Sequence, residues 1–312
     1  SERTRASVDA NELRGIYPEF DPLIAGLPAE IGRDRVLVRY DPALPPRVAL
    51  SRSLDGCTIM PIGTPVDMRS PGGHVRGRSP HRNTRWPYND GSPAPPTPLA
   101  LRPAFDAAFT GTYGVGSNTT ALVVVRDGKL VAERYAAGFG PEVPQRTWSI
   151  AKSFAGTYIG TLAAKGLVDV NAPAPVPEWQ APGDPRGRIT LDNLLRMASG
   201  LHSDTPGNRT DAIYFGGTAV TEQTIGWPLE APPGTRFRYA NNDILLAVRA
   251  VTARIPAEDR DLRPPGLADQ LDMLHTVLEQ DWRENFILSS QAWSTARDLA
   301  RLGMFWLADG VW

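Results

Sequence analysis

The chain has 312 residues, of which 41% are hydrophobic and 21% are charged, a composition typical of one large or two modest globular domains. The net charge of −1 gives no overall field that would attract nucleic acid or an anionic membrane. No apolar run reaches the ~20 residues that a membrane-spanning helix needs. The single cysteine, Cys57, excludes an internal disulfide and a cysteine-rich metal site. The opening "SERTRASVDANELRG" lacks the apolar core of a secretory signal, and the sequence distinguishes neither compartment nor oligomeric state.

Residues 1–98 are rich in proline and glycine and show no sustained hydrophobic period. This pattern predicts an irregular N-terminal arm ahead of a domain at 99–312. Within the arm, residues 69–88 carry five arginines and two histidines. We favour a solvated loop there over an anion- or nucleic-acid-binding loop, because only Trp86 and Tyr88 offer surface for base stacking.

Regular structure is predicted from residue 119 onward. The stretch "TTALVVVRDGKLVAERYAAG" contains two apolar runs joined at Asp127-Gly128, which indicates a β-hairpin. The following "TWSIAKSFAGTYIGTLAAKG" predicts a helix that ends at Gly166. Its apolar face is predicted from residues spaced by four: Ile150, Phe154, Tyr158 and Leu162.

Three further segments complete the predicted order. "ITLDNLLRMASGLH" predicts a helix from an N-cap at Thr190 to Gly200. A helix is expected to open at Asn241 or Asn242, and another to follow a capping pattern at Thr295 and Asp298. The intervening residues, 203–236 and 256–272, are predicted to be irregular.

Several catalytic patterns are absent from the sequence. There is no Gly-x-Ser-x-Gly elbow and no P-loop, and the glycines at 111, 114 and 116 lack the third glycine of a dinucleotide loop. The four histidines do not fall at metal-ligand spacing. We interpret His202 with Asp204 as a pair within a loop, in preference to part of a catalytic triad.

Ser149 and Lys152 form the strongest candidate pair. They lie at positions i and i+3 of the predicted helix, so their side chains are neighbours on one face. A serine needs an adjacent base to become a nucleophile, and a lysine kept neutral by burial can serve as that base. Lysine is scarce here, since Lys129 and Lys165 are the only others among 33 basic residues. A Ser-x-x-Lys match can also arise by chance.

Tyr239 and Asn241 form a second candidate pair, two residues apart before a predicted helix. A tyrosine can relay a proton to a leaving group, and an asparagine can bridge the lysine and a substrate amide. The structural alternatives are that Tyr239 is a core aromatic and that Asn241 is a helix cap.

Taken together, these residues resemble the penicillin-recognising serine hydrolases. "SIAK" is followed 90 residues later by "YAN", after the "DGKLVAERY" hairpin. "ITLDNLLRMASGLH" and "STARDLARLGMFWLADG" are similar to the connecting helices of that superfamily. The superfamily contains class C β-lactamases, D-alanyl-D-alanine carboxypeptidases, related esterases and 6-aminohexanoate-dimer (nylon oligomer) hydrolases. The resemblance covers residues 119–312, and the last segment with "RYAAGF" looks closest to the nylon-oligomer branch.

The resemblance implies an α+β fold of the β-lactamase/transpeptidase type, with an antiparallel sheet flanked by helices and a mainly helical lobe. It also implies an acyl-enzyme mechanism that needs no metal or organic cofactor. In that mechanism Ser149 is the nucleophile, Lys152 its general base, Tyr239 the proton relay and Asn241 a residue that positions the substrate. The backbone N–H of Ser149 becomes one of two oxyanion donors. Ser149 is therefore expected at a buried helix N-terminus, with Lys152 and Tyr239 converging on it.

The sequence departs from the family pattern in two places. The nylon-oligomer branch has a substrate-holding tyrosine after the "SGL" turn, whereas the first tyrosine after that turn here is Tyr214, at the end of the loop "HSDTPGNRTDAIY". No Lys-Thr-Gly or His-x-Gly motif precedes the final "ADGVW". We therefore expect the domain at 99–312 to lack the C-terminal strands of the family, most simply because the chain is a fragment.

Three functional hypotheses follow. The first is a serine hydrolase that cleaves an ester or amide, a class that includes linear amide oligomers, D-amino-acid peptides and β-lactams. The second is a catalytically inactive binding or sensing domain of the same fold. The third treats the motifs as accidents in an unrelated α+β domain. The predicted partner under the first hypothesis is a small-molecule substrate, with no nucleic acid and no membrane span.

Overall fold

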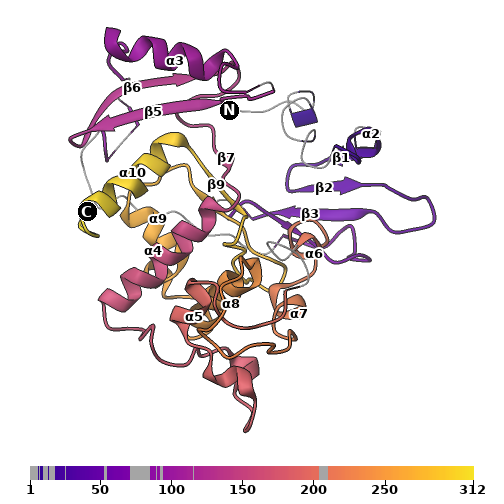
Figure 1. Cartoon of the computed structure of the whole chain (residues 1–312). Coiled ribbons are helices and arrows are strands. Elements are labelled where there is room, and N and C mark those ends of the chain that lie inside the picture. The colour runs from indigo at the N-terminus through magenta and orange to yellow at the C-terminus, as the bar shows by residue number, and fades with distance from the viewer. Residues whose placement is uncertain are drawn as a thin grey trace.

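The computed structural model covers the chain (Figure 1). The residues it describes are 6, 8–9, 13, 18–24, 26–52, 55–70, 85–88, 90–91, 94–114, 116–203 and 210–312. Most of the arginine-rich loop, residues 71–84, lies outside them, so its interpretation stays a prediction. Within the described residues, no helix combines the length and the apolar character needed to cross a bilayer.

A four-stranded antiparallel sheet lies in the N-terminal part, so the prediction of an irregular arm is wrong for residues 29–59. Its strands, in the order β1-β2-β3-β4, are Ala29–Ile31, Arg35–Val38, Arg47–Ser51 and Cys57–Ile59, and the short helix α2 (Asp21–Ile24) precedes them. The strands are too short for a sustained period, and buried residues alternate with more exposed ones only over the five residues of β3 and the three of β4. Val48 and Leu50 of β3 pack with Met60 and with Trp282 of the main body.

This sheet packs against the rest of the protein at two places, around residue 216 and around residues 280–282. The Thr58 hydroxyl donates to the Gln280 carbonyl at 3.0 Å, and Arg47 donates to the Gly216 carbonyl at 2.7 Å. Gly217 has a φ of +74°, and a Cβ there would overlap the carbonyl of Met60. Glycine is needed at 217 both for its backbone conformation and for this close approach.

The predicted hairpin is confirmed as β5 (Ala121–Arg126) and β6 (Lys129–Tyr135). Asp127 and Gly128 both have positive φ, 50° and 71°, as a two-residue hairpin turn requires. The hairpin lies between α3 (Arg102–Phe109) and α10 (Ala296–Leu307) (Figure 1). Successive side chains of a strand point to opposite faces. Arg134 accordingly stacks on Phe105 and Phe109 of α3, while Glu133 binds Arg297 of α10.

A mainly helical lobe holds the largest core. Its longer helices are α4 (Ile150–Ala164), α8 (Asn241–Thr252), α9 (Pro264–Gln270) and the C-terminal α10. The shorter elements of the lobe are η3 (Pro177–Trp179), η4 (Pro185–Arg188), α5 (Leu191–Leu195), α6 (Asp211–Tyr214), α7 (Val220–Gln223) and η5 (Arg260–Leu262). The short helix η2 (Leu99–Leu101) instead leads directly into α3. A three-stranded sheet in the order β7-β9-β8 adjoins the lobe, formed by Gln145–Arg146, Ala292–Ser294 and Val277–Leu278.

Several predicted boundaries are confirmed and others are wrong. The helix starts at Asn241 and after Thr295 are confirmed. The helix predicted to run to Gly200 ends at Leu195, and a helix, α9, occupies part of the region predicted as irregular at 256–272. In α4, Phe154, Tyr158 and Leu162 are buried as predicted, but Ile150 is 49% exposed, because the first turn of α4 opens toward solvent.

A buried charged network ties the segment at 85–91 to α10. Asp90 accepts hydrogen bonds from Arg301 at 2.8 Å and Arg297 at 3.3 Å. Arg297 also makes a bidentate contact to Glu133 at 2.8 and 2.6 Å, and Arg301 donates to Asp298 at 2.6 Å. The two arginines are almost fully buried. Loss of any partner would leave a buried charge uncompensated.

We expect Asp90→Ala to lower the free energy of unfolding by about 3 kcal/mol, because two buried guanidinium groups lose their shared carboxylate. Urea unfolding measures this, with Asp106→Ala, which removes an exposed pair with Arg134, as a control expected to cost less than about 1 kcal/mol.

Burial raises the pKa of Asp90, but hydrogen bonds from His275 and Arg301 outweigh it and lower the pKa from 3.8 to about 2. The stabilisation by ionised Asp90 is therefore present above pH 3.8 and is lost as the pH falls through about 2. The free energies of unfolding of the wild type and Asp90→Ala should approach each other at that pH.

Candidate active site

The start of α4 is fixed by the strand before it, β7, which pairs with β9. Strand β7 ends at Arg146, and the backbone N–H and hydroxyl of Thr147 both donate to the Ala292 carbonyl, at 2.9 and 3.0 Å. Trp148 then adopts a φ of +49°, an uncommon conformation for a bulky residue. The Arg146 guanidinium lies 3.7 Å from the centre of the Trp148 ring. These contacts set the direction in which the chain enters α4 at Ser149.

The structure brings the hydroxyl of Ser149 together with Lys152 and Tyr239. Lys152 Nζ lies 3.0 Å from Ser149 Oγ, and the Tyr239 hydroxyl donates to the same Oγ at 2.7 Å. Ser149 occupies the N-cap position of α4, yet its side chain makes no capping hydrogen bond. A serine cap is typically worth about 1 kcal/mol. The side chain forgoes that stabilisation and faces Lys152 and Tyr239 instead.

The predicted convergence on Ser149 is confirmed by these distances, but the predicted burial of the helix start is wrong. Ser149 is exposed, and Trp148 and Ile150 on either side of it are 39% and 49% exposed. Tyr239 is also 39% exposed. The Ser149 hydroxyl, which hydrogen-bonds with both Lys152 and Tyr239, therefore lies on an accessible face of the protein.

Lys152 is held on its other side by a backbone carbonyl. Its Nζ donates to the carbonyl of Ser289 at 2.7 Å, in a turn 137 residues further along the chain. Burial lowers the pKa of Lys152, and this effect exceeds the opposing effects of the Tyr239 hydrogen bond and charge. A lowered pKa increases the fraction of neutral amine, the form that can take a proton from Ser149.

Tyr239 also has a shifted acidity. Burial raises the pKa of Tyr239, but hydrogen bonds with Ser149 and Lys152, together with the positive charge of Lys152, outweigh this and lower it. Lys152 Nζ lies 4.9 Å from the centre of the Tyr239 ring. The pKa values of the lysine and the tyrosine are therefore both lowered, the direction that favours proton exchange between them in catalysis.

Asn241 makes a hydrogen bond to a residue outside the group formed by Ser149, Lys152 and Tyr239. It is the first residue of α8, and its amide donates to the Thr210 hydroxyl at 3.4 Å. Thr210 immediately precedes α6, which carries Tyr214. Asn241 thus contacts the loop before α6, and its predicted part in substrate positioning stays a prediction.

Sequence reasoning missed the parts of the site that lie behind Lys152. Tyr214 is only 5% exposed, and its hydroxyl pairs with the Ser289 hydroxyl at 2.5 Å. The contribution of Ser289 to Lys152 is a main-chain carbonyl, which carries no residue-type signal. The loop tyrosine singled out in the sequence is in the neighbourhood of the site, but it faces the protein interior.

His202, by contrast, belongs to a separate surface cluster. Its Nδ1 pairs with Glu230, and its ring stacks on Trp227 with centroids 5.1 Å apart. Asp204 lies outside the described residues, so the predicted loop pair stays a prediction.

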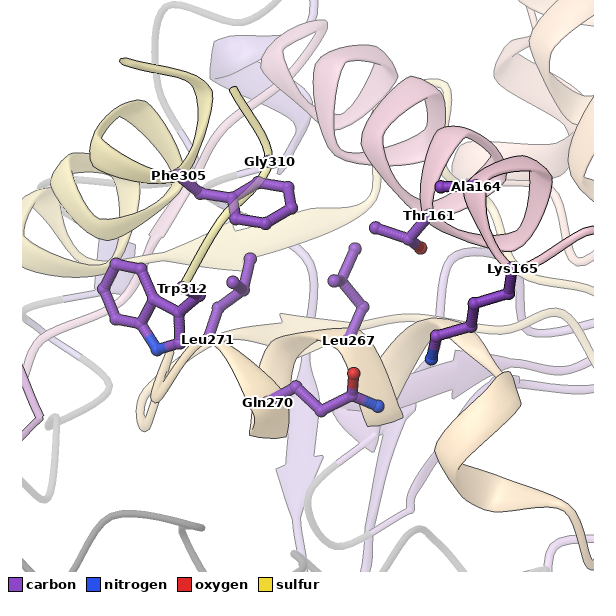
Figure 2. A pocket seen from close by; sticks show the side chains of 9 residues that line it. All are labelled: Thr161, Ala164, Lys165, Leu267, Gln270, Leu271, Phe305, Gly310 and Trp312. Carbon is purple, nitrogen blue, oxygen red and sulfur yellow. The ribbon is translucent and has the colours of Figure 1, made fainter. Parts of the chain in front are cut away.

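A cavity of about 470 Å³ lies away from this site, between α4, α9 and α10 (Figure 2). Its lining includes Thr161 and Lys165 near the C-terminal end of α4, Leu267 from α9, and Trp312. The helix has 15 residues, so this end is roughly 20 Å from Ser149. The cavity therefore takes no part in chemistry at Ser149.

Comparison with known proteins places the chain in a family. Residues 105–311 match the family described as Beta-lactamase. A 6-aminohexanoate-dimer hydrolase from Paenarthrobacter ureafaciens is 39% identical over 231 residues, which cover 62% of this chain and 53% of that protein. The chain thus spans about half the length of this curated relative.

A solved structure has a fold similar to that of this chain. A Bacillus anthracis protein, described as a candidate 6-aminohexanoate-dimer hydrolase, superposes with a TM-score of 0.52 at 24% identity. The match covers 72% of this chain and 60% of that one. The predicted α+β fold of the β-lactamase/transpeptidase type is confirmed.

Proposed function

Because the chain belongs to the beta-lactamase family, we propose that it acts as a serine hydrolase that cleaves an ester or amide through an acyl-enzyme on Ser149. The observation that carries the proposal is the pair of hydrogen bonds at Ser149 Oγ, from Lys152 Nζ at 3.0 Å and the Tyr239 hydroxyl at 2.7 Å. A serine hydroxyl becomes a nucleophile when a base within hydrogen-bond reach removes its proton, and the lowered pKa of Lys152 favours the neutral amine that can do so.

In the acylation half, Ser149 Oγ attacks the substrate carbonyl carbon while its proton passes to the neutral amine of Lys152. The carbonyl oxygen becomes an oxyanion, and the Ser149 N–H, at the start of α4, stabilises it. Collapse of this intermediate breaks the bond to the leaving alcohol or amine. Tyr239 protonates that leaving group and is reprotonated by Lys152.

In the deacylation half, water attacks the ester formed on Ser149. Tyr239 and Lys152 take the proton of the attacking water, and Ser149 recovers its own proton as the carboxylic acid leaves. One water is consumed, and each residue returns to its starting protonation state.

Esters are the substrates we propose to test first, followed by linear amides. The Paenarthrobacter ureafaciens relative is named for cleavage of an amide-linked dimer. Tyr214, the loop tyrosine considered for holding a substrate amide, is buried against Ser289 and does not present its hydroxyl at the surface. The burial of Tyr214 therefore favours esters over amides as substrates.

A fluorophosphonate probe tests the proposal directly. We expect one adduct per chain, mapped to Ser149 by peptide mass spectrometry, with no adduct in Lys152→Ala over the same period. Ser153, exposed on the same helix one turn further along, is an internal control and should stay unlabelled. Absence of any Ser149 adduct would support the inactive binding domain instead.

A further inference from the structure

The orientation of Lys152 depends on a hydrogen bond whose acceptor lies in the turn at residues 287–291. The turn is closed by Gln291 N–H donating to the Ile287 carbonyl at 2.9 Å. Ser289, in the middle of the turn, is fully buried, and its carbonyl accepts from Lys152 Nζ at 2.7 Å. A carbonyl can only accept, so one N–H of the amine must point toward it. A neutral Lys152 then has one further N–H, which can donate to Ser149 Oγ at 3.0 Å, and one lone pair, which can accept the serine proton.

Tyr214 holds that turn from the opposite side. Its hydroxyl pairs with Ser289 Oγ at 2.5 Å, and its own carbonyl accepts from the Gln291 side chain at 3.3 Å. Tyr214 also belongs to one buried apolar cluster with Ile287 of the same turn and Leu245 of α8. The tyrosine therefore binds the turn through two hydrogen bonds and a packing contact.

We propose that Tyr214 is a positioning residue, which fixes the Ser289 carbonyl through the Ser289 hydroxyl and so orients Lys152 toward Ser149. The inference rests on the proposed serine hydrolase function and deepens it. It gives Tyr214 a role in orienting Lys152 and no role in binding the substrate. The Tyr214 hydroxyl also hydrogen-bonds with the buried Thr210 side chain, so Tyr214 links the turn to the residue before α6. Loss of the hydroxyl would leave the buried Ser289 hydroxyl without this partner, which should free the turn and admit water beside Lys152.

The charged and titratable groups around this arrangement are few. Tyr239 faces Lys152, and the Arg146 guanidinium of β7 lies 5.9 Å from the centre of the Tyr214 ring. Burial raises the pKa of Tyr214 despite its hydrogen bonds and Arg146, so its hydroxyl stays protonated through the working range. A pH-dependent change caused by Tyr214→Phe would therefore report on Lys152 or Tyr239.

The test compares Tyr214→Phe, Ser289→Ala and Tyr158→Phe in the full chain. Tyr158 is the matched control, because it is a buried tyrosine on α4 whose hydroxyl donates to a carbonyl, that of Leu262, at 3.0 Å. The readouts are the labelling rate of Ser149 by the fluorophosphonate probe from pH 5 to 9, and kcat and KM for one ester and one linear amide.

We expect Tyr214→Phe and Ser289→Ala each to lower kcat about 10- to 100-fold with little change in KM, equally for the ester and the amide. The double variant should lose no more than either single variant, since both act through one hydrogen bond. The acid limb of the labelling profile should move to higher pH, because a more hydrated Lys152 is protonated up to a higher pH. Tyr158→Phe should match the wild type.

Three results would overturn the inference. Tyr214→Phe could behave like Tyr158→Phe, or its loss could be confined to KM for the amide, which would make Tyr214 a substrate contact. In both cases the wild type is labelled, so the proposed function survives. Failure of wild-type Ser149 to be labelled would overturn the function and the positioning role together.

Discussion

Lys152→Ala is expected to lower kcat/KM for a p-nitrophenyl ester by about 10³-fold, a larger loss for that substrate than we expect from Tyr239→Phe. The variant removes the base 3.0 Å from Ser149 Oγ, and general-base catalysis is typically worth ~10²–10⁴-fold. Substrate binding should persist, because Lys152 contacts Ser149 and Ser289 and is only partly exposed. Steady-state kinetics should therefore show the loss in kcat.

Lys152→Arg is the matched control for charge. An arginine keeps the positive charge but does not lose its proton at working pH, so it cannot serve as the base. We expect this variant to be as impaired as Lys152→Ala. Substantial activity in Lys152→Arg would show that the positive charge is what matters, and it would contradict the assignment of a neutral amine at position 152.

Tyr239→Phe is expected to show a loss that depends on the leaving group. For a linear amide we expect kcat/KM to fall about 10²- to 10⁴-fold, because the amine cannot leave without a proton and the hydroxyl 2.7 Å from Ser149 Oγ is removed. For a p-nitrophenyl ester the loss should be about tenfold or less, since this leaving group departs as a stable anion. A series of esters with leaving alcohols of increasing pKa would show the loss growing along the series.

The series contains its own control for misfolding, because an unfolded fraction would lower the rate for every ester by the same factor. An equal loss across the series would contradict the relay role of Tyr239. It would leave the hydroxyl with a purely structural part, as a hydrogen-bond partner that holds Ser149 in place.

The sequence by itself determined the features that depend on neighbours along the chain. Ser149 and Lys152 share a helix face because residues three apart in a helix are adjacent. The hairpin turn at Asp127-Gly128 and the helix start after Thr295 follow from local backbone preferences and capping, and the structure has both. Motifs in the right order along the chain then identified the family, which the comparisons confirm.

The tertiary structure decided what depends on segments far apart in the sequence. It placed Tyr239 against Ser149 across 90 residues, and the Ser289 carbonyl against Lys152 across 137. It also left Ile150 exposed at the open end of an otherwise buried helix face. Local preferences reach only a few residues along the chain. Contacts between distant segments follow from how whole elements pack, and a backbone carbonyl has the same chemistry at every residue, so the acceptor for Lys152 becomes identifiable only in the folded chain.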